Sequence, residues 1–251
     1  MAVRIAKIAL VVALLIYLAI GYIGGAAYIG QATAAVPVPD MDEQTLQEKY
    51  HIAPTERGLI GALRHPEVVV RNFAAIKLAN DGDKAAIRPI LDALAAEKVE
   101  GVKIGLATAA ARLGALEGFN ALRSMCEDRS WSPTFRMGAA QSVVYALGRQ
   151  ECLSDILDVL RSDPDDHEAV PTALNLLPRF QQIPPRQLDE VRSLVALYLQ
   201  GPALDLRLAA ATCIHDLGGP WAVSQLQAAW DGERDETVRR VLANYLLSVK
   251  Q

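Results

Sequence analysis

Histidine is the residue type in this chain that could most readily carry acid–base or metal chemistry. The sequence of 251 residues contains four histidines. His51, His65 and His215 stand far apart along the chain, and His167 is followed directly by Glu168. A metal site needs several such ligands close together, and one adjacent His–Glu pair does not supply them. We therefore predict that the chain has no metal site and binds no cofactor.

The three cysteines, Cys126, Cys152 and Cys213, form no CxxC pair and follow no regular spacing. An odd and sparse set of this kind does not indicate a disulfide framework. Cys213 lies in the apolar segment LAAATCIHDLG, where we expect a buried and unreactive thiol. The sequence also has no Gly-rich phosphate loop, nucleophile elbow or HExxH motif. It thus predicts a protein without a catalytic site.

The composition favours tightly packed helices. Hydrophobic residues make up 51% of the chain but aromatic residues only 6%, so Ala, Leu, Val and Ile dominate. Of the 25 basic residues, Arg4 and Lys7 precede the first apolar segment, whereas all 29 acidic residues follow it. The body of the protein is therefore acidic, which argues against nucleic acid as a partner.

The N-terminal segment has the composition of a membrane helix. A basic start at residues 1–7 is followed by residues 8–30, which carry no charge. At about 1.5 Å per residue, this stretch spans about 35 Å and could cross a hydrocarbon core of about 30 Å. A signal-peptide apolar region is about 7–15 residues long, so the length favours a retained anchor. The small-x-small sequence ATA at 32–34 also fits a cleavage site near residue 34.

The charges that flank this segment predict an orientation. Basic residues precede it and acidic residues follow it, which places the N-terminus in the cytoplasm. We therefore expect a single-pass protein of the inner or plasma membrane with an extracytoplasmic C-terminal body. Cleavage would instead release an exported, soluble body. Residues 31–54 are expected to form a linker, stiffened by Pro37 and Pro39, with a possible short helix.

The rest of the chain, residues 55–251, contains six copies of one template. Each copy has an apolar residue, then a usually basic residue, then an Ala-rich helix. The copies are spaced regularly, and this period indicates a repeat array. They begin at Val70, Val102, Phe135, Val170, Leu206 and Val238.

A second set of segments with helical apolar spacing lies between these helices. Each unit is therefore a pair of helices, and stacked pairs would share a continuous core. We predict an all-α, right-handed superhelical solenoid of about six helix pairs. Pro171 and Pro178 make the fourth copy irregular, so a kink is expected there. The predicted first helices are 55–64, 84–96, 117–128, 151–162, 186–200 and 220–230.

The template resembles the short HEAT-like repeats named after phycobilisome lyases, and tetratricopeptide and ankyrin signatures are missing. The resemblance implies a HEAT/armadillo-like fold over the whole body. The family name suggests bilin-lyase activity, but no bilin-handling motif can be matched. HEAT-like deoxyhypusine hydroxylases bind di-iron through several His–Glu dyads, of which this chain has one. The resemblance is carried by Val70-Arg71 with Ala74-Ala75, Phe135-Arg136 with Ala139-Ala140, and Leu206-Arg207 with Ala210-Ala211.

The resemblance also implies that the second helices of the pairs line a concave face. Residues there are small, apolar and almost uncharged, which suits a protein or peptide partner. The alternative is that close stacking buries them between neighbouring helices. The residues predicted to contact a partner are Phe73, Ile76, Ile104, Thr108, Met137, Gln141, Leu176, Leu208 and Thr212.

The basic residue of the template has a structural explanation. Glu67 stands four residues before Arg71, and Asp235 stands four before Arg239, so we expect an ion pair at each helix start. The function that these features favour is a membrane-anchored, non-enzymatic scaffold that binds a protein partner. The alternatives are an accessory or lyase-like factor acting on a cofactor-bearing client, and a structural subunit of a larger membrane complex.

Overall fold

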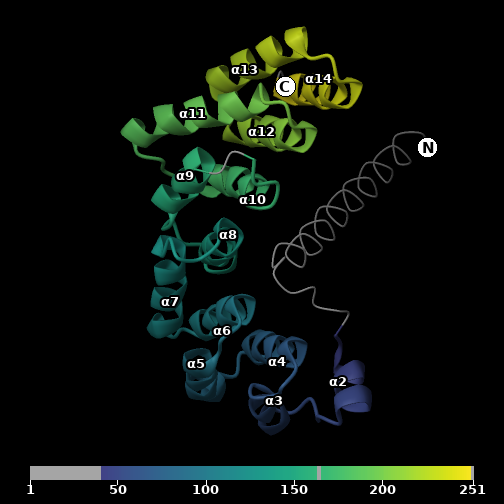
Figure 1. Ribbon diagram of the computed structural model, residues 1–251, viewed down its shortest axis with the longest axis vertical. Coiled ribbons are helices and arrows are strands. Elements are labelled where there is room, and N and C mark those ends of the chain that lie inside the picture. The colour runs from purple at the N-terminus through teal and green to yellow at the C-terminus, as the bar shows by residue number, and fades with distance from the viewer. Residues whose placement is uncertain (1–40, 163–164, 250–251) are drawn as a thin grey trace, which may run out of the picture. The chain divides into compact units, whose positions relative to one another are not determined.

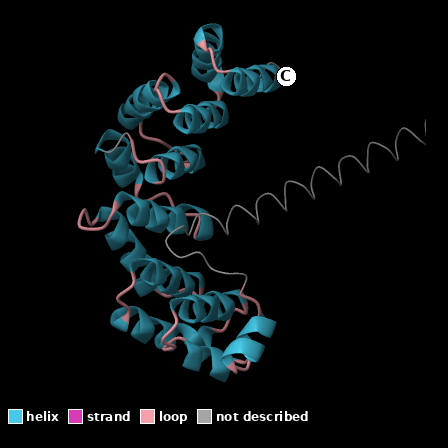
Figure 2. Cartoon of the chain, turned by 45° about the vertical axis from the view of Figure 1, so that its right-hand side comes forward, coloured by secondary structure: helices cyan, strands magenta, loops and turns pink. Residues whose placement is uncertain are grey.

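The computed structural model describes residues 41–162 and 165–249, and within these ranges every regular element is a helix (Figures 1 and 2). A short helix, α2 (Glu43–Tyr50), precedes six helix pairs. The first helices of the pairs are α3 (Glu56–Ala62), α5 (Ile87–Ala96), α7 (Leu116–Glu127), α9 (Leu153–Ser162), α11 (Pro185–Leu199) and α13 (Gly219–Gly232). The second helices are α4 (Val68–Asn80), α6 (Glu100–Arg112), α8 (Pro133–Gln141), α10 (Ala169–Leu176), α12 (Leu204–Leu217) and α14 (Glu236–Val249).

The second helices form one continuous layer, which we call the second-helix layer. Within it α4 contacts α6, α6 contacts α8, and the sequence of contacts continues through α10 and α12 to α14. Each first helix packs on the second helix of its own pair, and α7, α9 and α13 also contact a second helix of a neighbouring pair. Figure 1 shows the first helices side by side along the other side of the array. The predicted helix pairs are thereby confirmed.

The Ala-Ala steps of the template explain how the second helices come close together. All six of these alanines are fully buried, and their small side chains let neighbouring backbones approach. Larger side chains of the second helices, such as Leu78, Leu106 and Leu174, are also fully buried in the core. The buried steps are Ala74-Ala75, Ala139-Ala140 and Ala210-Ala211.

Caps and glycines set where the helices begin and end. The side chains of Thr55 and Ser132 accept hydrogen bonds from backbone N–H groups in the first turns of α3 and α8, and Pro133 occupies the first turn of α8. Gly114 and Gly148 follow the second helices of their pairs with φ of 99° and 63°. Only glycine adopts this left-handed conformation at little cost, so these positions stop the helices.

The third and fourth pairs are irregular. After α8 the chain continues as a π-helical turn, η2 (Ser142–Ala146), which the sequence did not predict. After α10 it tightens into a 3₁₀ turn, η3 (Leu177–Arg179), which contains Pro178. Proline lacks the N–H of a regular helix and clashes with the preceding turn, so the predicted interruption in the fourth copy is confirmed. A 3₁₀ turn, η1 (Lys84–Ala86), also precedes α5.

The predicted single-pass location in the inner or plasma membrane finds no support in the structure, and we withdraw it. Within residues 41–162 and 165–249, no helix combines the length and the apolarity needed to cross a bilayer. The anchor predicted at residues 8–30, its basic start at 1–7 and the cleavage site near 34 all lie outside the described residues.

The interpretation of the cysteines also needs correction, because Cys126 and Cys152 form a disulfide bond. Cys126 lies in the last turn of α7 and Cys152 immediately precedes α9, and both are buried. Stacking of consecutive pairs brings these two helix ends together, which the spacing of the cysteines along the sequence does not reveal. Cys213 is a free thiol that is 1% exposed, as expected, and burial raises its pKa far above the usual value.

Close contact between α6 and α7 makes Gly118 sensitive to substitution. A Cβ atom added at Gly118 would lie 2.6 Å from the Ala107 carbonyl oxygen and 2.8 Å from the Ala110 Cβ. We expect Gly118→Ala to lower the free energy of unfolding by about 1–3 kcal/mol, despite the higher helix propensity of alanine. Urea unfolding followed by circular dichroism would measure this change.

Gly61 provides a matched control, because it lies in α3 and a Cβ atom added there would meet no atom within 4 Å. Gly61→Ala should therefore stabilise the protein by about 0.5–1 kcal/mol through helix propensity. Equal effects of the two substitutions would contradict the close packing of α6 on α7.

Candidate functional site

A half-buried arginine joins the first helix pair to the second. The guanidinium of Arg71, in α4, donates from Nε to Glu97 Oε2 at 2.7 Å and from Nη2 to Glu97 Oε1 at 3.0 Å. Its Nη1 donates to the backbone carbonyls of His65 and Pro66. Glu97 follows α5, so this bidentate contact bridges two consecutive pairs. The ion pair is largely shielded from solvent, because the Arg71 side chain is 14% exposed and the Glu97 side chain 5%.

The same arrangement recurs between the fifth and sixth pairs. Arg207, in α12, donates from Nε to Glu233 Oε2 at 3.0 Å and from Nη1 to the carbonyls of Gly201 and Pro202. Both carboxylates also accept backbone N–H bonds from the two residues that follow them. The template therefore encodes a repeated clamp in which an arginine holds the turn of the next pair.

The middle pairs use variants of this clamp. Arg136, in α8, is buried, donates from Nη2 to Asp158 Oδ2 at 3.0 Å and donates from Nε to the Cys126 carbonyl. Lys103, in α6, holds the corresponding position in the second pair, and its ammonium lies 5.8 Å from the centroid of the Trp131 ring. These contacts also reach the next pair along the chain.

The ion pairs predicted from the four-residue spacing are wrong. Arg71 binds Glu97 in place of Glu67, and Glu67 accepts a hydrogen bond from the Tyr50 hydroxyl at 2.8 Å. Asp235 accepts backbone N–H bonds at the start of α14, and Arg239 lies over the Trp230 ring. Arg71 thus binds an acid of the neighbouring pair, whereas Arg239 contacts an aromatic ring of its own pair.

The environment of Glu97 makes this clamp dependent on pH. Burial raises the pKa of Glu97, but hydrogen bonds from Arg71 and from two backbone N–H groups outweigh burial and leave the pKa below its usual value. The stability from ionised Glu97 is therefore present above the unfolded-state pKa of about 4.3. It is lost as the pH falls through the lower folded-state pKa.

Three of the predicted partner-binding residues lie in the core. Ile104, Met137 and Leu176 are at most 4% exposed, so they pack between helices and cannot contact a partner on the surface. This outcome corresponds to the burial alternative, because close stacking of the second helices covers these positions. The other six predicted residues, which are half-buried or exposed, are Phe73, Ile76, Thr108, Gln141, Leu208 and Thr212.

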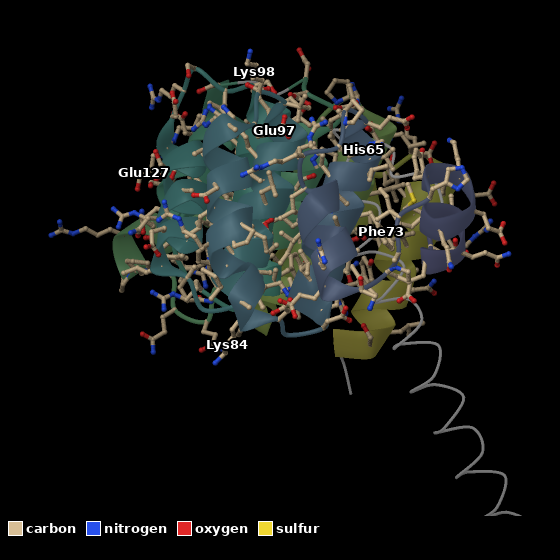
Figure 3. All side chains as sticks on the ribbon, turned by 90° about the horizontal axis from the view of Figure 1, so that it is seen from below. His65, Phe73, Lys84, Glu97, Lys98 and Glu127 are labelled. Atoms are coloured by element: carbon tan, nitrogen blue, oxygen red, sulfur yellow. A yellow bond between two sulfur atoms is a disulfide. The ribbon has the colours of Figure 1, made fainter. Side chains whose placement is uncertain are left out.

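The accessible residues combine apolar and polar groups. Ile76 is 36% exposed on α4, and the half-buried Phe73 lies on the same helix, away from the edge that holds Glu97 and Lys98 (Figure 3). Thr108 and Thr212 donate their hydroxyl groups to carbonyl oxygens four residues earlier in their own helices. The Thr212 hydroxyl also lies 3.0 Å from the Tyr245 hydroxyl.

Two polar clusters on the second-helix layer were not predicted from the sequence. In the first, the Tyr145 hydroxyl donates to the Asn175 carbonyl at 3.3 Å and accepts from Arg179 Nε at 3.0 Å. Tyr145 is 42% exposed, and its ring also lies against the Arg179 guanidinium. No sequence motif predicts this cluster, because its members come from three separate elements, η2, α10 and η3.

The second cluster joins the ends of α12 and α14. The rings of His215 and Tyr245 stack with centroids 4.3 Å apart, and the His215 nitrogens lie 2.8 Å from Asp216 Oδ1 and 3.0 Å from Ser248 Oγ. This order of atoms matches a Ser–His–Asp triad. However, the Ser248 hydroxyl donates to the Tyr245 carbonyl at 2.8 Å, so its proton is committed to the backbone. The cluster therefore fits a structural contact between α12 and α14 better than a catalytic site with a serine nucleophile.

His167 binds a carboxylate of the next pair. Its Nδ1 lies 2.6 Å from Asp205 Oδ2, and this hydrogen bond and the negative charge raise the pKa of His167. We expect the His167 ring protons to titrate in NMR with a midpoint above the usual value of about 6.5. Asp205→Asn should move that midpoint back toward the usual value. An unchanged midpoint in Asp205→Asn would contradict the contact.

The sign of the associated stability change follows from the raised pKa. Protonated His167 stabilises the pair fully below the unfolded-state pKa of about 6.5, and this contribution is lost as the pH rises through the folded-state pKa. Glu168, the second member of the His–Glu dyad, accepts a hydrogen bond from Thr134 at 3.3 Å and does not share a ligand site with His167. The described residues contain no group of three or more potential metal ligands.

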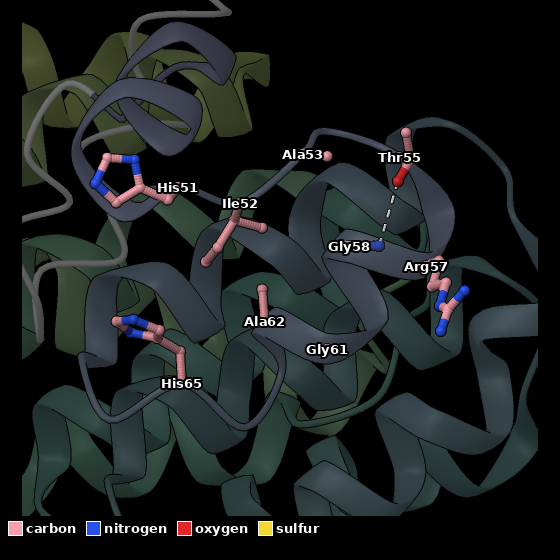
Figure 4. A pocket seen from close by; sticks show the side chains of 9 residues that line it. All are labelled: His51, Ile52, Ala53, Thr55, Arg57, Gly58, Gly61, Ala62 and His65. Carbon is pink, nitrogen blue, oxygen red and sulfur yellow. Dashed lines mark hydrogen bonds between the residues drawn. The ribbon is translucent and has the colours of Figure 1, made fainter.

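Two open pockets have most of their lining residues outside the second-helix layer. The larger, of about 520 Å³, lies between the segment that follows α2 and helix α3. Its lining includes His51, His65 and Arg57 and the apolar side chains of Ile52 and Ala62 (Figure 4). The smaller, of about 290 Å³, lies between the second and third pairs. Its lining residues are Leu94, Lys103, Ala121, Ser124, Met125, Asp128 and Trp131.

The arrangement of the helix pairs is similar to that of solved repeat proteins. The complex of CpcE and CpcF of phycocyanin lyase from Nostoc sp. PCC7120 matches with a TM-score of 0.50 and 20% identity, over 85% of this chain and 83% of that chain. A designed armadillo repeat protein in complex with the peptide (KR)4 matches with a TM-score of 0.49 and 14% identity, over 76% and 98% of the two chains. No family model and no curated protein sequence matches the chain. The first likeness supports a HEAT-like repeat fold.

Proposed function

We propose that this chain is a HEAT-like scaffold that binds a protein or peptide partner on its second-helix layer. The observation that carries the proposal is the set of accessible side chains that follows this layer from pair to pair. Ile76, Gln141 and Leu208 come from three different pairs on helices that form one layer. A continuous surface of this kind suits an extended partner, which can contact one repeat after another.

The rigid spacing of these side chains supports the proposal. Arg71 and Arg207 clamp consecutive pairs, so the accessible residues are held at a defined separation without a ligand. A surface ordered before binding loses less conformational entropy when a partner arrives. Mixed apolar and hydrogen-bonding groups are also usual in non-obligate interfaces.

Co-purification with a tagged chain tests the proposal. We expect the chain to retain a stoichiometric protein partner, identified by mass spectrometry, and Ile76→Asp to reduce its recovery at least tenfold. Leu197→Asp is a matched control, because Leu197 is 66% exposed on α11, outside the second-helix layer. Loss of the partner in both variants, or in neither, would contradict binding through this layer.

A second candidate is an accessory or lyase-like factor that acts on a cofactor-bearing client. The likeness to the phycocyanin lyase complex supports this candidate at the level of fold. It requires the client to carry a bound chromophore or metal, so absorption spectra and metal analysis of the co-purified partner distinguish it from a scaffold. A partner without either group would exclude this candidate.

A further inference from the structure

The clamp between consecutive pairs is incomplete at the junction of the second and third pairs. The acidic residue of the clamp lies five residues before the apolar start of the next second helix, as Glu97 and Glu233 do. At the junction of the second and third pairs this position is Ser130, and the basic residue is Lys103. This junction therefore keeps the cation of the clamp but lacks the carboxylate.

Within the described part of the chain, Lys103 has no salt bridge, and its recorded contact is with the Trp131 ring. The exposed Ser130 is too short to replace a glutamate, and its backbone N–H donates to Asp128 Oδ1 at 2.9 Å. Lys103 is half-buried, and a half-buried ammonium without an ion pair attracts an incoming anion, because the attraction is stronger away from water.

The space beside Lys103 is open. The pocket of about 290 Å³ at this junction is lined by Lys103, by the Trp131 ring and by apolar groups of Leu94 and Met125. At the junction of the first and second pairs, and again at that of the fifth and sixth, the clamp positions hold an arginine and a glutamate that are largely shielded from solvent. The pocket is thus the place of the missing ion pair.

We propose that this pocket binds a peptide side chain that carries a single carboxylate, with an apolar residue beside it. The carboxylate pairs with the Lys103 ammonium, as Glu97 pairs with Arg71, and the neighbouring apolar residue packs on Trp131 and Met125. The partner is therefore an acidic, apolar segment of a second protein. Apart from Lys103, the residues that line this pocket lie outside the second-helix layer, and the pocket does not depend on binding at that layer.

Asp128 limits the charge that the pocket accepts. It lines the pocket, and hydrogen bonds from Ser130 lower its pKa, so it stays ionised at neutral pH. A second carboxylate on the ligand would approach this negative charge. The site therefore selects one isolated acidic residue over a run of acidic residues.

Fluorescence anisotropy with a labelled peptide tests the proposal. The probe is the end-blocked sequence Gly-Leu-Glu-Leu-Gly carrying a fluorescein, and its matched control has glutamine in place of glutamate. We expect the glutamate peptide to bind at least about tenfold more tightly, which corresponds to about 1.4 kcal/mol. Equal affinities, no measurable binding of the glutamate peptide, or stronger binding of an oligoglutamate peptide would overturn the proposal.

Variants of the pocket locate the site. Lys103→Met should abolish the difference between the two peptides, whereas Lys103→Arg should keep it. Ser130→Glu should restore the missing carboxylate. It should therefore raise the midpoint of thermal unfolding by a few degrees and reduce peptide affinity at least tenfold. Ser130→Gln should change neither the midpoint nor the affinity. Retained discrimination in a folded Lys103→Met protein would overturn the proposal.

The variant Ile76→Asp separates this inference from the proposed function. Ile76 lies on α4, outside the pocket, so the substitution should leave peptide affinity unchanged while it disrupts binding on the second-helix layer. Loss of peptide binding in Ile76→Asp would place the peptide on that layer and overturn the assignment to the Lys103 pocket.

Discussion

Replacing Cys126 and Cys152 together by alanine should lower the free energy of unfolding by about 3.5 kcal/mol. The disulfide joins residues 26 positions apart and encloses α8 and η2. In the unfolded chain the bond restricts this loop, and its removal restores conformational entropy that folding must overcome. The effect exceeds that of most single substitutions because it acts on the whole enclosed segment.

Urea unfolding with and without a phosphine reductant would measure this effect. The wild-type protein should lose stability once the bond is reduced, whereas the double alanine variant should not respond. A thiol assay on the denatured, unreduced protein should find one free thiol, that of Cys213. Three free thiols, or equal stability of the two proteins under oxidising conditions, would contradict the disulfide and its predicted effect.

Arg207→Ala should lower the free energy of unfolding by about 2–3 kcal/mol. The substitution removes the charged partner of Glu233 and leaves the carbonyls of Gly201 and Pro202 without their donor. Because Arg207 and Glu233 are only 15% and 12% exposed, water cannot fully replace these bonds. Lysine carries the charge without the planar fork, so Arg207→Lys should recover less than half of the loss.

Arg88→Ala is the control for this prediction. Arg88 forms an ion pair with Asp92 on the surface of α5, and its side chain is 83% exposed. Its removal should cost at most about 0.5 kcal/mol, because an exposed pair gains little in water. A double-mutant cycle with Glu233→Gln would isolate the coupling of Arg207 and Glu233. A coupling no larger than that of Arg88 and Asp92 would contradict a structural role for the clamp.

The helix pairs could be predicted from the sequence because each copy of the template has the same pattern of residues that pack in the core. The Ala-Ala steps and the apolar start of each second helix recur at the period at which pairs stack. Pro178 predicted the irregular end of the fourth pair for an equally local reason, since proline cannot continue a regular helix.

The side-chain partners could not be predicted because they depend on how the pairs stack. Arg71 has an acid four residues earlier, but its position in the fold brings the acid of the next pair within reach. The same limitation applies to the predicted binding residues: periodicity places Ile104 and Met137 on a common helix face, but only packing shows that this face is covered. The disulfide between Cys126 and Cys152 likewise forms across two pairs.

The buried side chains of α6 belong to two separate hydrophobic clusters. Val102 and Leu106 pack in the cluster that runs from α2 to α6, whereas Ile104 and Ala107 pack in the cluster that extends to α14. In a repeat array stabilised by contacts between neighbouring helix pairs, each hydrophobic cluster can have its own free energy of unfolding. Helix α6 therefore acts as a boundary between two cooperative folding units, and amide exchange in this helix will follow the more persistent unit.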